Sequence, residues 1–171
     1  MIAYRRTICI AVALATLAAF WLMAPPAAHA QQGFQRFVPF LVELSGWKGG
    51  KPDGMTMEIP GQSVITATRE YERGEARLTA QIILGPPAQG ALAATGQNVK
   101  FETSDSRMSS GPIDGFQVTR TFTISDKSGA VMVALGTSAV FILQFNGVGD
   151  DEALTLARNF NWKAIQAALP K

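Results

Sequence analysis

VITATREYERGEARLTAQIIL, residues 64–84, is the stretch in which the pattern of apolar and polar residues is clearest. The two kinds alternate on both sides of the pair Arg73-Gly74, as they do in β-strands that bury one face. A two-residue turn at that pair would place Tyr71 opposite Ala76. The stretch therefore predicts an antiparallel hairpin whose inner face carries Ile65, Ala67, Tyr71, Ala76, Leu78, Ala80 and Ile82.

Shorter strands are expected on both sides of this hairpin. Residues 116–125 alternate as cleanly as the hairpin does, and residues 139–145 are almost wholly apolar, which is typical of a central strand. Weaker patterns predict strands at residues 55–59, 99–103 and 130–135. Together with the two arms of the hairpin, these segments predict an antiparallel sheet of about six to seven strands.

Three helical segments are expected around the sheet. Residues 34–47 repeat apolar side chains at helical spacing, with Pro39 in the first turn. Residues 87–95 have proline early and glycine late, and Asp150 and Asp151 would cap a terminal helix. The predicted fold class is α+β, an antiparallel sheet with N-terminal, middle and C-terminal helices packed on it.

This order of elements resembles the small α+β fold of PsbP-like proteins, the extrinsic subunits of the oxygen-evolving complex and their relatives. The resemblance rests on the hairpin at 64–84, the strand around GFQVTRTF (115–122) and the closing helix. It implies a non-catalytic binding or assembly factor, because members of that fold serve mostly in that capacity. A likeness in element order assigns no site residue.

The first thirty residues have the three zones of a secretory signal peptide. Arg5 and Arg6 give the positive start, residues 8–24 are almost wholly apolar or small, and the motif AHA ends at Ala30. We expect cleavage after Ala30, which would leave residues 31–171 as a single domain that is periplasmic or secreted.

Two alternatives to this leader stay open. The apolar run could remain as an uncleaved membrane anchor, although it is slightly short for a span and the AHA motif follows it promptly. The pair Arg5-Arg6 also fits twin-arginine export. The strong apolar core favours the Sec-type route, in which the chain crosses the membrane unfolded.

The only histidine, His29, and the only cysteine, Cys9, both lie within the predicted leader. After cleavage the chain would lack a disulfide, a thiolate nucleophile or metal ligand, and an imidazole for a Ser-His-Asp triad. No phosphate-binding loop and no G-x-S-x-G motif occurs either. We therefore predict that the protein is not an enzyme and carries no cofactor.

The net charge also limits the possible partners. Arg5 and Arg6 belong to the leader, so removing them leaves thirteen Lys and Arg against thirteen Asp and Glu. A neutral domain without a basic run argues against nucleic acid and against electrostatic docking to anionic lipid. An envelope protein or a small ligand remains as the expected partner, and after cleavage no membrane association is expected.

Arg69 and Arg120 are the least ordinary charged residues, because each interrupts an otherwise apolar strand face. A buried arginine needs a carboxylate or another acceptor. One interpretation is a pocket for a ligand or anion, which the planar guanidinium would contact with paired donors. The other is a sheet margin, where the long stem covers apolar surface and the head reaches water.

Met55 and Met57 form an M-x-M pair, and thioether ligands suit Cu(I) in an exported protein. Residues two apart in a strand face the same way, so a core-facing strand would show the same spacing. With no histidine to complete a metal site, the core interpretation is favoured here.

The sequence thus favours an exported, non-catalytic binding or assembly protein of unknown partner. A methionine-based copper carrier using Met55 and Met57 is the first alternative. A small enzyme that uses carboxylate and arginine chemistry is the second, and an open pocket lined by Arg69, Arg120 and an acid would favour it.

Overall fold

The computed structural model describes residues 33–93 and 98–170. The predicted signal peptide and its cleavage site after Ala30 lie outside these residues. The body that begins at Gly33 is described by itself below.

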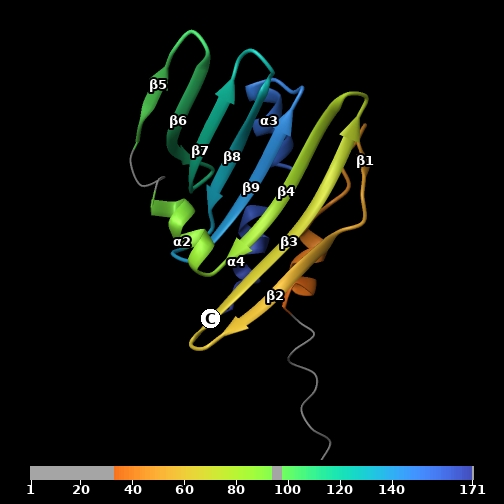
Figure 1. The fold of residues 1–171 in the computed structure, drawn as a ribbon, viewed down its shortest axis with the longest axis vertical. Helices are drawn as coiled ribbons and strands as arrows, with labels where there is room; N and C mark the ends of the chain where they lie inside the picture. Colours follow the sequence, from red (N-terminus) through yellow and green to blue (C-terminus); the bar gives the residue numbers. More distant parts are fainter. Residues whose placement is uncertain (1–32, 94–97, 171) are drawn as a thin grey trace, which may run out of the picture. The chain divides into compact units, whose positions relative to one another are not determined.

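Within the described residues, nine strands form one sheet in which every neighbouring pair is antiparallel. The order across the sheet is β1-β3-β4-β9-β8-β7-β6-β5, and β2 pairs with β3 on the same side as β1 (Figure 1). The strands are β1 Lys48–Gly49, β2 Asp53–Ile59, β3 Gln62–Arg73, β4 Ala76–Leu84, β5 Lys100–Glu102, β6 Ser106–Ile113, β7 Phe116–Thr123, β8 Ser128–Ala134 and β9 Ala139–Asn146.

Short helices cover the two faces of the sheet unequally. The 3-10 helix η3 (Phe34–Phe40) and the helices α3 (Asp150–Ala157) and α4 (Trp162–Ala167) pack on one face, which we call the inner face. The helix α2 (Pro86–Ala93) lies on the opposite, open face, toward the viewer in Figure 1. The inner face carries the large hydrophobic core, whereas α2 covers only a small apolar patch around Val140 and Ile142.

The predicted α+β sheet of six to seven strands is wrong, because composition conceals two strands. β1 is only two residues long. β6 has the sequence SRMSSGPI, in which serine, glycine and proline replace the alternating apolar residues that usually mark a strand. Its hairpin with β7 closes at Asp114-Gly115, whose φ angles of 53° and 86° fit a two-residue type I′ turn.

The expected N-terminal helix over residues 34–47 is also wrong. Helical structure ends at Phe40 and is of the tighter 3-10 type, because Pro39 lies inside it and lacks the N–H that a longer helix needs. The apolar spacing still marks buried positions, since Phe37, Leu41 and Leu44 all lie in the core. The expected terminal helix is divided into α3 and α4.

The central hairpin forms one residue further along than the pattern suggests. The turn is Gly74-Glu75 instead of Arg73-Gly74, so Tyr71 lies opposite Leu78 and not Ala76. Gly74, with φ of 59°, takes the first turn position, which a type II′ turn reserves for glycine. Moving the turn by one residue keeps each side chain on the same face, so the expected inner face is the buried one.

Candidate functional site

Arg69 lies on the inner face of β3 and is 7% exposed, so the interpretation as a sheet margin whose head reaches water is wrong for this residue. Its Nε donates to the carbonyl of Gly50 and its Nη1 to the carbonyl of Leu41, each at 2.8 Å. Its Nη2 forms an ion pair with Glu43. The carboxylate and the other acceptors that a buried arginine requires therefore come from the chain itself, and the guanidinium holds the segment before β2 against the sheet.

Tyr71, two residues further along β3, contacts the same segment before β2. Its hydroxyl donates to the carbonyl of Val42 at 2.7 Å, and the Arg69 guanidinium lies 5.3 Å from its ring centroid. Burial raises the pKa of the Tyr71 phenol to about 12, although the nearby positive charge of Arg69 works against that rise. Arg69 and Tyr71 together fix residues 41–43 on the inner face.

A β-bulge interrupts the edge of the sheet beside Arg69. Pairing to β3 extends from β1 as far as Glu70 and resumes in β2 at Thr68. Residues 51–52 therefore lie opposite the single residue Arg69, and the extra residue is accommodated as a bulge. Pro52 fits this position because it has no N–H to contribute to a ladder.

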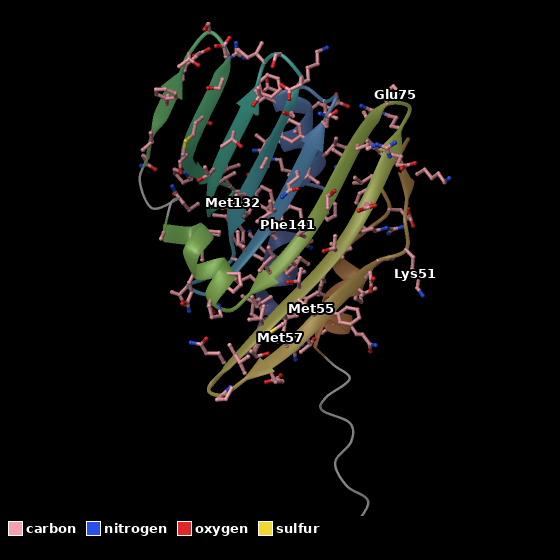
Figure 2. The ribbon with its side chains drawn as sticks, viewed as in Figure 1. Lys51, Met55, Met57, Glu75, Met132 and Phe141 are labelled. Carbon is pink, nitrogen blue, oxygen red and sulfur yellow. The ribbon has the colours of Figure 1, made fainter. Side chains whose placement is uncertain are left out.

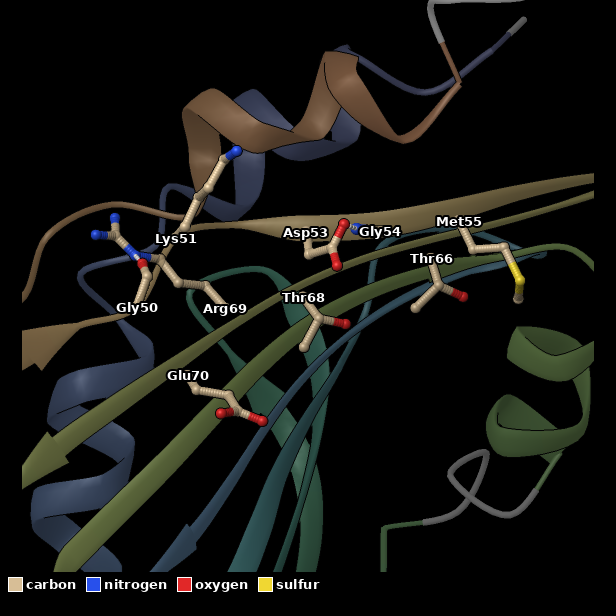
Figure 3. Close-up of a pocket in the computed structure, with 9 residues that line it drawn as sticks. All are labelled: Gly50, Lys51, Asp53, Gly54, Met55, Thr66, Thr68, Arg69 and Glu70. Carbon is tan, nitrogen blue, oxygen red and sulfur yellow. Dashed lines mark hydrogen bonds between the residues drawn. The ribbon is translucent and has the colours of Figure 1, made fainter.

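A cavity of about 630 Å³ opens at this bulge (Figure 3). In Figure 3 the Arg69 guanidinium extends away from Thr66, Thr68 and Glu70. Arg69 thus contributes to the wall of the cavity while its charged end is engaged by the chain. The lining residues are Gly50, Lys51, Asp53, Gly54, Met55, Thr66, Thr68, Arg69 and Glu70.

Five of the lining side chains form a compact patch on the open face. Asp53 lies directly opposite Thr68, and Met55 lies directly opposite Thr66. Glu70 follows Thr68 at the next position on the same face of β3. The patch therefore places two carboxylates around one hydroxyl, with a second hydroxyl and a thioether beside them.

Neither carboxylate of the patch forms an ion pair with another described residue. Asp53 accepts the backbone N–H of Gly54 at 2.8 Å, and Glu70 is exposed. Lys51 borders the same cavity, and it too forms no ion pair within the described part of the chain. The wall of the cavity is more apolar than polar, and its two carboxylates against the one ammonium of Lys51 give it a negative bias and acceptors to offer a ligand.

This patch is not evident from the sequence because Asp53 lies in KGGKPDG, which has the composition of a loop. Pro52, just before an alternating run, could have indicated an edge strand with a bulge, since proline in a sheet is confined to edges, strand starts and bulges.

Arg120 lies apart from Arg69 and is bound to α3. Its Nε donates to Asp150 at 3.0 Å and its Nη2 to Asp151 at 2.9 Å, with the Arg120 side chain 17% exposed. Burial alone would lower the pKa of Arg120, but the hydrogen bonds to Asp150 and Asp151 raise it above its ordinary value. The cavity beside Arg69 does not include Arg120, which instead lines a separate cavity together with Asp150 and Asp151.

The acidic residues at the start of α3 do not act as the expected side-chain caps. Gly149 is the N-cap residue and no side chain accepts a capping hydrogen bond there. Asp150 and Asp151 instead bind Arg120, and Glu152 accepts from Arg73 at 2.6 Å. The acidic run therefore docks the helix onto the sheet, and its negative charge also suits the positive end of α3.

Met55 and Met57 are on the surface, so the favoured core interpretation is wrong. They are 50% and 47% exposed, and they lie side by side on the open face of β2 (Figure 2). The spacing correctly predicted that the two side chains share a face, but β2 is an edge strand and no helix of the described residues covers its open face. Among the described residues, no group of three or more His, Cys, Asp or Glu could hold a metal ion.

The chain matches no protein-family model, no curated protein and no solved structure. In the described part of the chain, no helix has the length and apolar character needed to span a membrane.

Proposed function

We propose that this protein is a non-catalytic binding protein, exported to the periplasm or secreted, and that it holds a small polar ligand in the cavity at the β-bulge. The ligand class is a compound with a positively charged nitrogen and a short hydrogen-bonding chain. The PsbP-like resemblance supports the same broad role, since it also implies a binding or assembly factor.

The observation that carries this proposal is the pair of carboxylates without a cationic partner. Asp53 and Glu70 flank Thr68 on one face, and the cavity above them is large enough for a small molecule. A carboxylate in such a site gains most from a charged donor, because a charge-assisted hydrogen bond is about twice as strong as a neutral one.

The same side chains favour binding over catalysis. The lining residues include neither histidine nor cysteine. Thr66 and Thr68 are the hydroxyl groups present, and no hydrogen bond joins either of them to a carboxylate that could act as its base. The patch offers recognition groups fixed on two paired strands.

The first test is the mass of the protein recovered from its native compartment, measured intact under native and then denaturing conditions. Extra mass found only under native conditions gives the mass of the ligand. An amine of low mass is the expected result, and an anionic ligand would contradict the proposed class. The denatured mass also reports whether the chain starts at Gln31.

The second test uses putrescine as a probe amine at low ionic strength. We expect putrescine to raise the melting temperature, and Asp53→Asn or Glu70→Gln to abolish that shift. Glu75→Gln, in the turn after β3, is the matched control because it removes the same charge outside the cavity. An equal loss in all three variants would mean a general charge effect and would overturn the assignment.

A second candidate function is Cu(I) binding by Met55 and Met57. The observation that favours it is their exposure on one face, where two thioethers are accessible to a soft cation. Cu(I) under reducing conditions should stabilise the protein, and the Met55→Leu/Met57→Leu variant should lose this effect. Met108→Leu is the control, and a thermal shift indifferent to Cu(I) would remove the candidate.

A further inference from the structure

The two edges of the sheet are built differently. The edge strand β5 has three residues, and two of them are the charged Lys100 and Glu102. The edge strand β2 has seven residues, and among the described strands it pairs with β3 alone. Its open face carries Met55 and Met57 (Figure 2) as well as Ile59, and all three are among the exposed large hydrophobic side chains.

Short length and charge protect an edge strand from pairing with other chains. β5 has both protections. β2 also carries two charged side chains, Asp53 and Glu58, but it is longer and presents a row of three exposed apolar side chains. The outer backbone groups of β2 pair with no strand in the described part of the chain. Such an edge is suited to accept another strand, with backbone hydrogen bonds providing affinity and side chains providing specificity.

We propose that β2 pairs antiparallel with β2 of a second copy of this chain, about a two-fold axis at Thr56. In this register Met55 lies opposite the partner's Met57, and Asp53 lies opposite the partner's Ile59. The open faces of the two sheets then form one continuous surface. This inference does not depend on the ligand cavity.

The symmetry of the strand about Thr56 selects a second copy as the occupant. Pro52 and Pro60 each lie four residues from Thr56, and neither has an N–H for a ladder. They bound the same seven residues, 53–59, from both ends. A self-paired ladder centred on Thr56 uses all seven residues, and every other antiparallel register shortens it.

The side chains agree with the same register. Met55 and Met57 of both protomers would form one apolar cluster, because directly opposed residues in an antiparallel pair have Cβ atoms about 4.5–5.5 Å apart. The carboxylates of β2 avoid one another, since Glu58 lies opposite the partner's Gly54. A register centred on Asp53 or on Glu58 would instead place two like charges face to face, which is destabilising.

The association should be weak, because seven residues a side is far fewer than the roughly 20–30 of a standard interface. Sedimentation velocity over a range of concentrations should show a monomer that becomes a dimer in the micromolar range or above. Met55→Lys/Met57→Lys should abolish the dimer by bringing ammonium groups together. Phe101→Lys, on the exposed face of β5, is the matched control and should leave the dimer unchanged.

Crosslinking tests the register independently of any effect on folding. In a Cys9→Ser background, one chain carries Met55→Cys and a second, ¹⁵N-labelled chain carries Met57→Cys. The mixture should form labelled–unlabelled disulfides faster than either variant alone, because paired Cα atoms lie within disulfide range. Fastest crosslinking of Met55→Cys with itself would overturn the Thr56 axis.

A monomer at every concentration, without crosslinks between the two chains, would overturn the second copy as occupant. A crosslink from Met57→Cys to a different protein in the native compartment, in place of the self-crosslink, would do the same. That result would identify a foreign strand as the occupant of the β2 edge.

Discussion

At the scale of single residues, Arg69 and Arg77 show how one side chain type serves two purposes on one hairpin. Arg69 is buried and satisfies the carbonyls of Leu41 and Gly50 as well as binding Glu43. Arg77 binds Glu72 across the exposed side of the hairpin. Burial decides how much each arginine contributes to stability. Water screens an exposed ion pair, whereas a buried carbonyl has no other hydrogen-bond donor.

Replacing Arg69 by methionine should therefore lower the free energy of unfolding by about 1–3 kcal/mol, since the buried carbonyl of Leu41 loses its donor. Replacing Arg77 by methionine should cost about 0–1 kcal/mol, the range of exposed pairs. Urea unfolding of both variants provides the measurement. Equal costs would show that Arg69 does not hold residues 41–50 in place.

Tyr71 should make stability depend on pH in the alkaline range. Its pKa is about 12 in the folded protein and near 10 when unfolded, so only the unfolded chain loses its proton easily between these values. The stabilisation is complete below pH 10 and is lost as pH rises toward 12, at a cost of roughly 2 kcal/mol. Urea unfolding across this range should show the loss in the parent protein.

Tyr71→Phe should remove this part of the pH dependence while lowering stability at neutral pH, because the hydrogen bond to Val42 is lost. Every other titratable side chain is the same in both proteins, so the difference between the two curves isolates Tyr71. Parallel curves would mean that the phenol titrates as it does in water.

At the scale of elements, the acidic start of α3 is a docking device. Asp150 pairs with Arg120 where both side chains are largely buried, at 22% and 17% exposure. The pair Arg158–Asp114 joins the helix end to a turn where both side chains are about half exposed. The two pairs differ in geometry as well as in surroundings, because two Arg120 nitrogens contact Asp150 whereas one contact from Nε joins Arg158 to Asp114.

A double-mutant cycle with Asp150→Ala and Arg120→Ala should give a coupling energy of at least ~1 kcal/mol, because less water competes for the charges. The same cycle for Asp114 and Arg158 should give about 0.5 kcal/mol or less. The free energies come from thermal or urea unfolding of each set of four proteins. A larger coupling at the exposed pair would contradict the docking role of Asp150.

Element boundaries were predictable from the sequence wherever local chemistry and tertiary packing agreed. Alternation found the buried face of the 64–84 hairpin, and Gly74 set its turn one residue beyond the expected position. β6 was not predicted because its pairing depends on the Asp114-Gly115 turn and not on apolar alternation. The Asp-Gly pair was a usable hairpin signal that the serine-rich composition concealed.

The candidate site was predictable only in part, because it depends on which strands lie at an edge. The sequence singled out Arg69 and Met55, which both line the cavity, without the carboxylates beside them. Asp53 and Glu70 become neighbours through the pairing of β2 with β3 after a bulge. That pairing is a long-range property, and within the sequence only Pro52 pointed to it, because proline in a sheet is confined to edges, strand starts and bulges.

At the scale of the whole described body, the two faces of the sheet make unequal contributions to stability. Leu143 and Ile142 are consecutive in the central strand β9 and have the same neighbouring strands, β4 and β8. Leu143 faces the large core under η3, α3 and α4, whereas Ile142 faces the small cluster under α2. α2 buries a single residue, Ala88, so this cover can relax when a side chain beneath it shrinks.

Leu143→Ala should therefore lower the free energy of unfolding by about 3–4 kcal/mol, because the surrounding core cannot close the cavity. Ile142→Ala should cost about 2 kcal/mol, and the loss should be concentrated in α2. Hydrogen exchange distinguishes the two effects. In Ile142→Ala the amides of α2 should exchange faster while those of β7 and β9 change little, and in Leu143→Ala exchange should quicken throughout the sheet. If both variants quicken exchange equally in every strand, α2 is an integral part of the core and the two faces act as one cooperative unit.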